Sequence, residues 1–169
     1  MNDKFSRKLN DLRISVTDRC NFRCRYCMPE ELYGEAFEFL KKDQVLSFEE
    51  ITRLSKIFIS LGVKKIRLTG GEPLVRKNVP ELISSIFSLN KNIDLAMTTN
   101  GYLLKKHAKE LYDSGLKRLT VSLDTLDEKI FKEMSGKNFK VNNVLEGIDE
   151  AVKVGFKKIK INSVIKKGV

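Results

Sequence analysis

Three cysteines are the residues of this sequence best suited to carry chemistry: Cys20, Cys24 and Cys27. They are all the cysteines of the 169-residue chain, and they share one polar loop with C-x-x-x-C-x-x-C spacing. Thiolates are soft ligands that select zinc, copper(I) or iron–sulfur clusters, so three of them in one loop suggest a metal site. Structural thiols of a reduced protein would have no reason to gather in a polar loop.

The number of ligands separates the candidate metals. Structural zinc normally takes four protein ligands, yet there is no fourth cysteine, and the single histidine, His107, belongs to a separate helix-like segment. A [4Fe–4S] cluster held by three thiolates leaves one iron open, whereas a ferredoxin-like electron carrier normally uses four cysteines. The count favours a cluster with an open iron. A zinc-bearing nucleic-acid-binding module is the alternative from another class.

Composition bounds the class of protein. The length fits one domain with a sizeable core. Residues 1–10 are polar without the apolar region of a secretory signal, and no apolar run is long enough to span a membrane. We therefore expect a cytoplasmic protein that binds no membrane. The net charge of +10 suits nucleic acid, an acidic surface or a polyanionic small molecule, or it reflects a solvated lysine-rich surface.

Strand-like and helix-like segments alternate along the chain. Strands are expected at 12–17, 64–69, 93–98, 117–123 and 157–165. Helices are expected from Ser47, which forms a capping box with Glu50, from about Pro80, and over 103–114, 127–134 and 141–154. Residues 28–46 read as a long irregular connection. Strand–helix repetition of this kind predicts an α/β fold with a parallel sheet.

The predicted strands have one apolar and one polar face. The polar positions are Arg13, Ser15, Thr17, Lys65, Arg67, Thr69, Asp94, Ala96, Thr98, Asn100, Arg118, Thr120, Ser122, Asp124, Lys158, Lys160 and Asn162. A closed TIM barrel would fill its interior with Val, Ile and Leu, and helix-length crossovers disfavour a flat antiparallel sheet. We expect a partial (βα) TIM-like barrel whose interior holds ligands.

Cations on the polar face indicate the charge of that ligand. Arg13, Lys65, Arg67 and Lys160 come from three different predicted strands. Cations clustered inside a barrel are costly unless an anion neutralises them, and arginine with lysine suits phosphate oxygens. A triphosphate fits a concave interior better than nucleic acid does. For Lys65, together with Lys158 and Arg118, a position in solvent at the barrel ends stays open.

A wider stretch, LRISVTDRCNFRCRYCMP at 12–29, resembles the cluster loop of radical S-adenosylmethionine (SAM) enzymes, most specifically of the GTP 3′,8-cyclase family of molybdenum cofactor biosynthesis. RLTGGEP at 67–73, TTNG at 98–101 and VSLD at 121–124 extend the resemblance over about 7–167. Each motif ends a predicted strand on the carboxyl side, where barrel enzymes place their active sites.

The resemblance implies roles for individual residues. The cysteines would bind three irons of a [4Fe–4S] cluster whose fourth iron takes SAM. The SAM-binding residues would be Tyr26, Gly70, Gly71, Glu72, Asn100, Ser122 and Asp124. The GTP-binding residues would be Arg13, Lys65, Arg67, Thr98 and Lys160. The implied reaction is reductive cleavage of SAM to a 5′-deoxyadenosyl radical, which takes the ribose 3′ hydrogen of GTP before the sugar carbon adds to C8 of guanine.

The resemblance also implies parts that do not follow here: a sixth strand and a domain with a second cysteine triad. Residues 1–169 are thus expected to form a radical SAM core truncated after the fifth strand, able to bind cluster and SAM but not fully active alone. GTP would be the substrate and a flavodoxin or ferredoxin the reductant, without nucleic acid. A homodimer, the roles of Asp18 and Arg19, and another radical SAM enzyme modifying a peptide or cofactor stay open.

Overall fold

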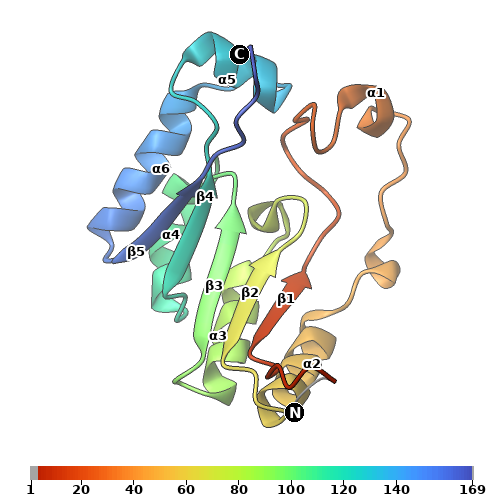
Figure 1. Cartoon of the computed structure of the whole chain (residues 1–169), viewed down its shortest axis with the longest axis vertical. Helices are drawn as coiled ribbons and strands as arrows, with labels where there is room; N and C mark the ends of the chain where they lie inside the picture. The colour runs from red at the N-terminus through yellow and green to blue at the C-terminus, as the bar shows by residue number, and fades with distance from the viewer. Residues whose placement is uncertain (1–3, 169) are drawn as a thin grey trace.

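Five parallel strands form a single sheet in the order β1-β2-β3-β4-β5 in the computed structural model, which describes residues 4–168 (Figure 1). The strands are β1 (Asp11–Ser15), β2 (Lys65–Thr69), β3 (Asp94–Thr99), β4 (Arg118–Ser122) and β5 (Lys158–Asn162). Each strand pairs with the next one along the chain because a helix-containing crossover returns the chain to the same edge. The predicted parallel α/β fold is confirmed.

Helices fill the crossovers. They are α2 (Phe48–Ser60), α3 (Val79–Leu89), α4 (Leu104–Asp113), α5 (Glu128–Ser135) and α6 (Val141–Lys153). The predicted capping box of α2 is confirmed, since Glu50 N donates to Ser47 Oγ at 3.2 Å and Ser47 N donates to Glu50 Oε2 at 2.7 Å. In the described part of the chain, no helix is both long and apolar enough to cross a bilayer.

The connection from β1 to α2 is more ordered than its irregular sequence suggests. It contains a short helix, α1 (Glu30–Tyr33), and a 3-10 helix, η1 (Lys42–Gln44). A further 3-10 helix, η2 (Pro73–Val75), follows β2. The sequence prediction missed α1 because a single turn carries too few residues to show an apolar period.

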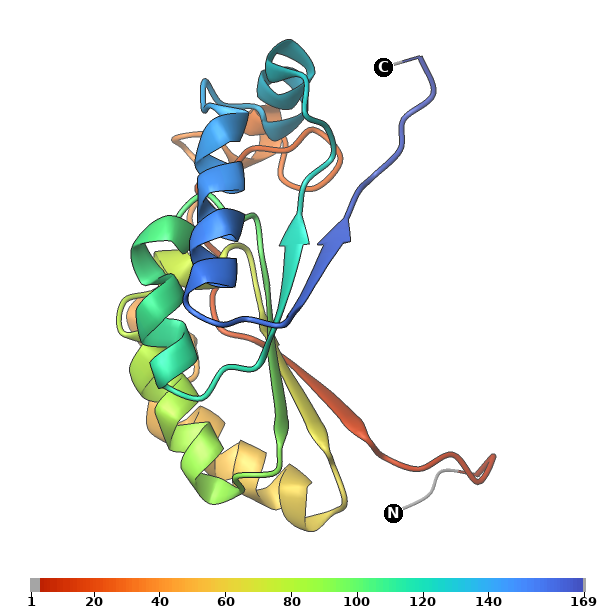
Figure 2. The same cartoon turned by 90° about the vertical axis from the view of Figure 1, so that its left-hand side faces the viewer.

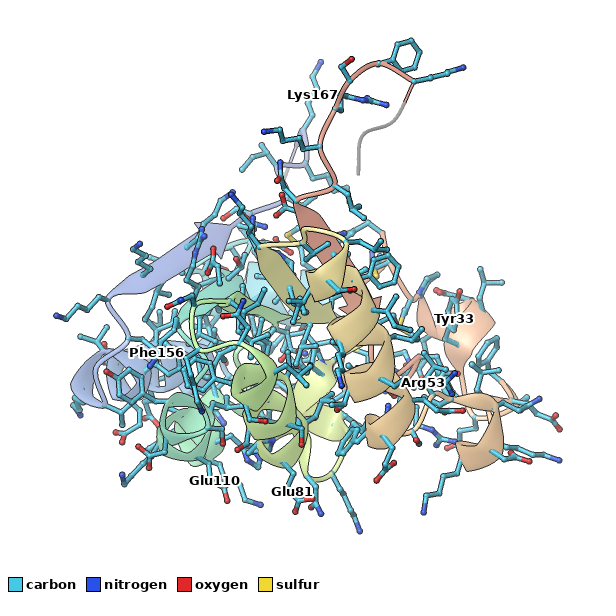
Figure 3. The ribbon with its side chains drawn as sticks, turned by 90° about the horizontal axis from the view of Figure 1, so that it is seen from below. Tyr33, Arg53, Glu81, Glu110, Phe156 and Lys167 are labelled. Atoms are coloured by element: carbon cyan, nitrogen blue, oxygen red, sulfur yellow. The ribbon has the colours of Figure 1, made fainter. Side chains whose placement is uncertain are left out.

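The helices cover only one face of the sheet. Figure 2 shows them on one side, with the other side of the strands bare and concave. Seen from below, the helices that carry Arg53, Glu81 and Glu110 lie together outside the sheet (Figure 3). The strand residues under these helices are fully or almost fully buried: Ile66, Leu68, Leu95, Met97, Leu119 and Val121. The predicted division into an apolar helix-facing side and a polar inner side is confirmed.

The sheet has an exposed edge at β5. Ile161 is 45% exposed, and Ile165, beyond the strand, is 87% exposed. The strand was predicted to continue to Ile165, but it ends at Asn162. Ser163 Oγ donates to Leu123 O at 2.6 Å and Val164 N donates to Asp124 Oδ1 at 2.9 Å, so the chain turns across the end of β4 instead.

Candidate cluster and nucleotide site

Four loops meet at the carboxyl ends of β1 to β4. The first is the cysteine loop, residues 16–29. Its Asn21 Oδ1 accepts a hydrogen bond from Asn100 Nδ2 at 2.8 Å, after β3, and its Tyr26 hydroxyl donates to Asp124 Oδ2 at 2.7 Å, after β4. Gly71 N, after β2, donates to Thr17 O at 2.8 Å. The four motifs of the sequence therefore belong to one site.

The cysteines are free thiols. Cys20 and Cys24 are half-buried and Cys27 is exposed. Burial raises the pKa of Cys20, and it raises the pKa of the Cys24 thiol to about 12, with smaller contributions from the neighbouring thiols. Because the thiolate is the metal ligand, binding of a metal must displace these protons.

The thiols of the cysteine loop are the soft donors that zinc and iron–sulfur clusters bind. As they lie here, among residues 4–168, no three Cys, His, Asp or Glu side chains are grouped so that they could hold one metal ion. Beside Cys20, the buried Nδ2 of Asn21 has no acceptor within the described chain. A donor of this kind suits a sulfur atom or a carboxylate at the site.

The Gly70–Gly71 turn packs directly on the segment that leads into Cys20. A Cβ on Gly70, whose φ is +146°, would lie 2.4 Å from Thr17 O, and one on Gly71 would lie 2.3 Å from Arg19 O. Glu72 N also donates to Arg19 O at 2.8 Å. These glycines were predicted to admit the methionine end of SAM. The structure adds a second reason for them, which is close approach to the protein's own backbone.

The Gly71→Ala variant is expected to push residues 17–19 away from β2. Its new methyl group meets backbone, which has little freedom to move, so we expect a loss of about 1–3 kcal/mol in the free energy of unfolding and weaker iron binding. Urea unfolding of the metal-free protein measures the first effect. Equal stability of Gly71→Ala and the parent chain would contradict the prediction.

Glu72 lies inside the protein, only 1% exposed. Its Oε1 accepts hydrogen bonds from Leu74 N at 3.0 Å and Thr99 Oγ1 at 2.8 Å, and its Oε2 accepts one from Asn100 N at 2.7 Å. Burial raises the pKa of Glu72, and the three hydrogen bonds oppose that rise. The carboxylate therefore shapes its own turn, as expected from the sequence, and also fixes the end of β3.

The other residues assigned to SAM line a small cavity at the ends of β3 and β4. Its walls include Cys24, Tyr26, Asn100, Ser122 and Asp124. Burial, followed by the hydrogen bond to Asp124, raises the pKa of Tyr26. Two wider grooves lie beside residues 74–81: one also borders α4, and the other also borders residues 16–19 at the start of the cysteine loop. Tyr26 and Asp124 are hydrogen-bonded to each other, so a ligand at this place would share or replace that contact.

Two rows of side chains run across the concave face. The strand register aligns Arg13, Arg67, Ala96, Arg118 and Lys158 in one row, and it aligns Thr98, Thr120 and Lys160 in the next row toward the cysteines. An Arg67 guanidinium nitrogen donates to Thr98 Oγ1 at 3.0 Å and to Thr120 Oγ1 at 2.9 Å. Four residues assigned to GTP therefore lie in these two rows, namely Arg13, Arg67, Thr98 and Lys160, whereas Lys65 is aligned with Asp11 and Asp94.

These cations differ in how far the protein already neutralises them. Lys65 pairs with Asp11 at 2.9 Å, and Arg118 pairs with Asp94 at 2.5 Å. Within residues 4–168, Arg13 and Lys160 form no hydrogen bond or ion pair through their side chains. Lys65 is also two residues farther from the cysteine loop than Arg67 along β2. Arg13, Arg67 and Lys160 are thus the stronger candidates for an anion.

Two further groups support this site, Asp18, whose role the sequence left open, and Thr120, which was not assigned to it. Asp18 Oδ2 accepts a hydrogen bond from Leu40 N at 2.7 Å, so this residue ties the cysteine loop to the connection that follows it. Thr120 supports the Arg67 guanidinium although it was not assigned to the site. Thr120 was recognisable from its place on the polar face, whereas no local pattern indicates the contact of Asp18 with Leu40.

Known proteins share both the sequence and the fold. The sequence profile of the radical SAM superfamily matches residues 14–169. A GTP 3′,8-cyclase of Staphylococcus epidermidis is 54% identical over 167 residues, and one of Staphylococcus aureus is 50% identical over the same length. Both alignments cover 99% of this chain and 49% of the relative. The chain spans about half the length of the curated relatives it matches.

Solved structures agree on the architecture. Methylornithine synthase superposes with a TM-score of 0.70 at 14% identity, covering 93% of this chain and 45% of that one. The FeFe-hydrogenase maturase of Carboxydothermus hydrogenoformans gives 0.70 at 19% identity, covering 93% of this chain and 36% of that one. The expected partial barrel is confirmed as a fold that these proteins share.

Proposed function

Because the chain belongs to the radical SAM superfamily, we propose that Cys20, Cys24 and Cys27 hold a [4Fe–4S] cluster that binds SAM, and that the chain is the radical SAM core domain of a GTP 3′,8-cyclase. The relatives that bear this name support the second part. The observation that carries it is the pair of aligned rows of cations and threonines on the bare concave face, next to the cysteine loop.

Phosphate recognition explains that face. Arg13 and Lys160 are cations without a protein partner among the described residues, and Arg67 is held in place by Thr98 and Thr120. A triphosphate would neutralise them through charge-assisted hydrogen bonds. Holding the nucleotide against a rigid sheet fixes its ribose relative to the cysteine loop, which is the main contribution that positioning makes to catalysis.

When bound, the cluster and SAM would supply the one-electron chemistry, with a small protein such as a flavodoxin or ferredoxin as the source of the electron. The chain's own residues do the rest. SAM would bind near the cysteines, at Gly70, Gly71, Asn100 and Ser122. The buried carboxylate of Glu72 holds the ends of β2 and β3 together through its hydrogen bonds. Helices on the outer face of the sheet exclude water from that side.

Electron paramagnetic resonance of the anaerobically reconstituted and reduced chain tests the cluster. We expect a [4Fe–4S]⁺ signal that changes when SAM is added, because SAM would occupy the open iron. A signal indifferent to SAM would contradict the proposal. Zinc in place of iron, with salt-dependent binding of nucleic acid, would favour the zinc-bearing module instead.

Replacing Arg67 by methionine tests the nucleotide. Removal of a charged, doubly hydrogen-bonded group at a phosphate site costs about 1.5–3 kcal/mol, so GTP binding should weaken by about 10-fold or more, as measured by equilibrium dialysis. Arg53→Met is the matched control, because Arg53 is exposed on the outer surface of α2 (Figure 3). Equal GTP affinity of the two variants would argue for a radical SAM enzyme with another substrate.

A further inference from the structure

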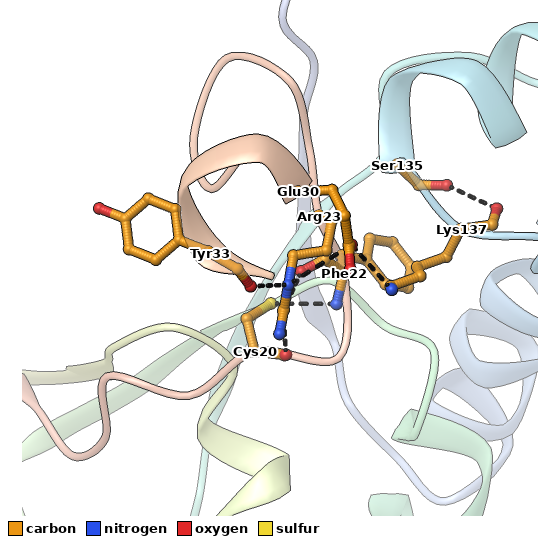
Figure 4. Close-up of polar contacts among 7 residues, drawn as sticks. All are labelled: Cys20, Phe22, Arg23, Glu30, Tyr33, Ser135 and Lys137. Carbon is orange, nitrogen blue, oxygen red and sulfur yellow. Dashed lines mark hydrogen bonds and ion pairs between the residues drawn. The ribbon is translucent and has the colours of Figure 1, made fainter. Parts of the chain in front are cut away.

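One side chain of the cysteine loop, Arg23, turns back onto the loop itself (Figure 4). Its Nη1 donates to Cys20 O at 2.8 Å and to Phe22 O at 2.9 Å. Its Nε donates to Tyr33 O at 2.8 Å, at the end of α1. One guanidinium therefore binds three backbone carbonyls, two of which lie between the first and second cysteines.

Burial makes these bonds stronger than the neighbouring ion pair. The side chain of Arg23 is 15% exposed, whereas that of Glu30, whose carboxylate lies 3.7 Å from Nε, is 52% exposed. The Glu30 carboxylate is half-exposed and pairs more closely with Lys137, at 2.9 Å, so its contact with Arg23 contributes little. Hydrogen bonds from a mostly buried guanidinium to carbonyls are charge-assisted and roughly twice as strong as neutral ones. The carbonyls, more than Glu30, therefore fix the position of the guanidinium.

The backbone on either side of Arg23 is held from outside the loop. Arg23 N donates to Ser135 O at 2.8 Å, at the end of α5. Gly136, with φ of +65°, approaches so closely that a Cβ there would lie 2.1 Å from Arg23 O. Phe22 is buried against Phe131 and Phe139, with ring centroids 5.9 and 5.4 Å away. The segment between Cys20 and Cys24 is thus packed on the connection from α5 to α6.

We propose that Arg23 is a positioning residue that holds the cysteine loop in its ligand-presenting shape before iron arrives. The inference rests on the proposed function, because it assigns the loop the task of holding a cluster. The carbonyl of Cys20 is one of the groups it binds, so loss of the guanidinium unties this carbonyl from Tyr33 and loosens the backbone that sets the distance from Cys20 to Cys24. A loop that must order itself binds metal less tightly, since binding then includes the cost of ordering.

Arg23→Ala is the direct test, and Arg25→Ala is its matched control. Arg25 is in the same loop, but its side chain is 66% exposed and, among residues 4–168, pairs only with Glu133, at 3.3 Å. Loss of a residue that supports a metal ligand typically costs 10- to 100-fold in metal affinity. We expect Arg23→Ala to bind iron at least about 10-fold more weakly and to give a broadened resonance signal, and Arg25→Ala to resemble the parent chain.

Two readouts separate positioning from a general loss of stability. Millimolar guanidinium should restore part of the iron binding of Arg23→Ala by occupying the empty place, although the same ion lowers the stability of any protein. In the metal-free chain, hydrogen exchange of the cysteine-loop amides should be faster in Arg23→Ala, with the amides of β2 and β3 unchanged. If Arg23→Ala does not fold, Arg23→Lys takes its place in both measurements. Its single ammonium cannot reproduce the fork of the guanidinium, so its iron binding should be weaker, and its loop exchange faster, than in the parent chain.

The outcomes are distinct. The proposal is overturned if Arg23→Ala binds iron and exchanges its loop amides as the parent chain does. If only Arg23→Lys folds, the same result in that variant overturns it. The proposal is also overturned if iron binding is weak, added guanidinium does not restore it, and hydrogen exchange is faster throughout the sheet, because the variant has then lost general stability. If the parent chain itself binds no iron, the proposed function fails. The exchange measurement on metal-free protein then still decides whether Arg23 holds the loop.

Discussion

The Cys24→Ala variant is expected to lose almost all stable iron, binding less than about a tenth of the iron of the parent chain after anaerobic reconstitution. Two remaining thiolates should not retain a cluster that already lacks a fourth protein ligand, and the sequence has no cysteine besides Cys20, Cys24 and Cys27 to replace the lost one. Iron and sulfide content per chain, with the visible absorption of the cluster, measure the effect.

The metal-free protein provides the control for this result. Cys24 is half-buried, so its truncation should alter the free energy of unfolding by no more than about 1–2 kcal/mol, and the loss of iron would not reflect a loss of fold. His107→Ala should retain all the iron, because His107 lies on α4 beside Glu110, outside the cysteine loop. Full iron in Cys24→Ala, or loss of metal in His107→Ala, would contradict the assignment of the ligands.

Glu72→Ala is expected to be the most destabilising single substitution at this site. It leaves three donors, Leu74 N, Thr99 Oγ1 and Asn100 N, without their acceptor in the interior. Each buried donor without a partner costs about 1–3 kcal/mol, so three of them predict a loss of roughly 3–9 kcal/mol. That is a large share of the total stability of a domain, about 5–15 kcal/mol. Urea unfolding of the metal-free chain measures it.

Glu72→Gln separates the hydrogen bonds from the shape of the side chain. Its one remaining oxygen can still accept from Leu74 and Thr99, but its amide then faces the N–H of Asn100. We therefore expect about half the loss seen with alanine. Glu81→Ala on the exposed surface of α3 should change stability by no more than about 0.5 kcal/mol. If Glu72→Ala were as stable as Glu81→Ala, the carboxylate would not be the acceptor that joins β2 to β3.

The sequence by itself determined the fold and indicated the candidate site. Alternation along residues 65–69 and 94–99 assigned each side chain to a face of the sheet, because the period of a strand is two residues whatever surrounds it. Ser47 with Glu50 marked the start of α2, since capping is a contact between residues three apart. The three cysteines indicated the proposed cluster site, because their spacing within one loop is local information.

Only the tertiary structure decided how these parts are held together. Glu72 with Thr99, Arg23 with Tyr33, and the close approach of Gly71 to Arg19 join separate elements, and no local period or spacing records such contacts. The ion pair of Lys65 with Asp11 likewise depends on the register between β1 and β2. Lys65 and Lys160 are both predicted cations of the polar face, but in the folded chain Lys65 is paired with Asp11 and Lys160 has no partner among residues 4–168. Burial and partners, which determine energies, are properties of the folded chain.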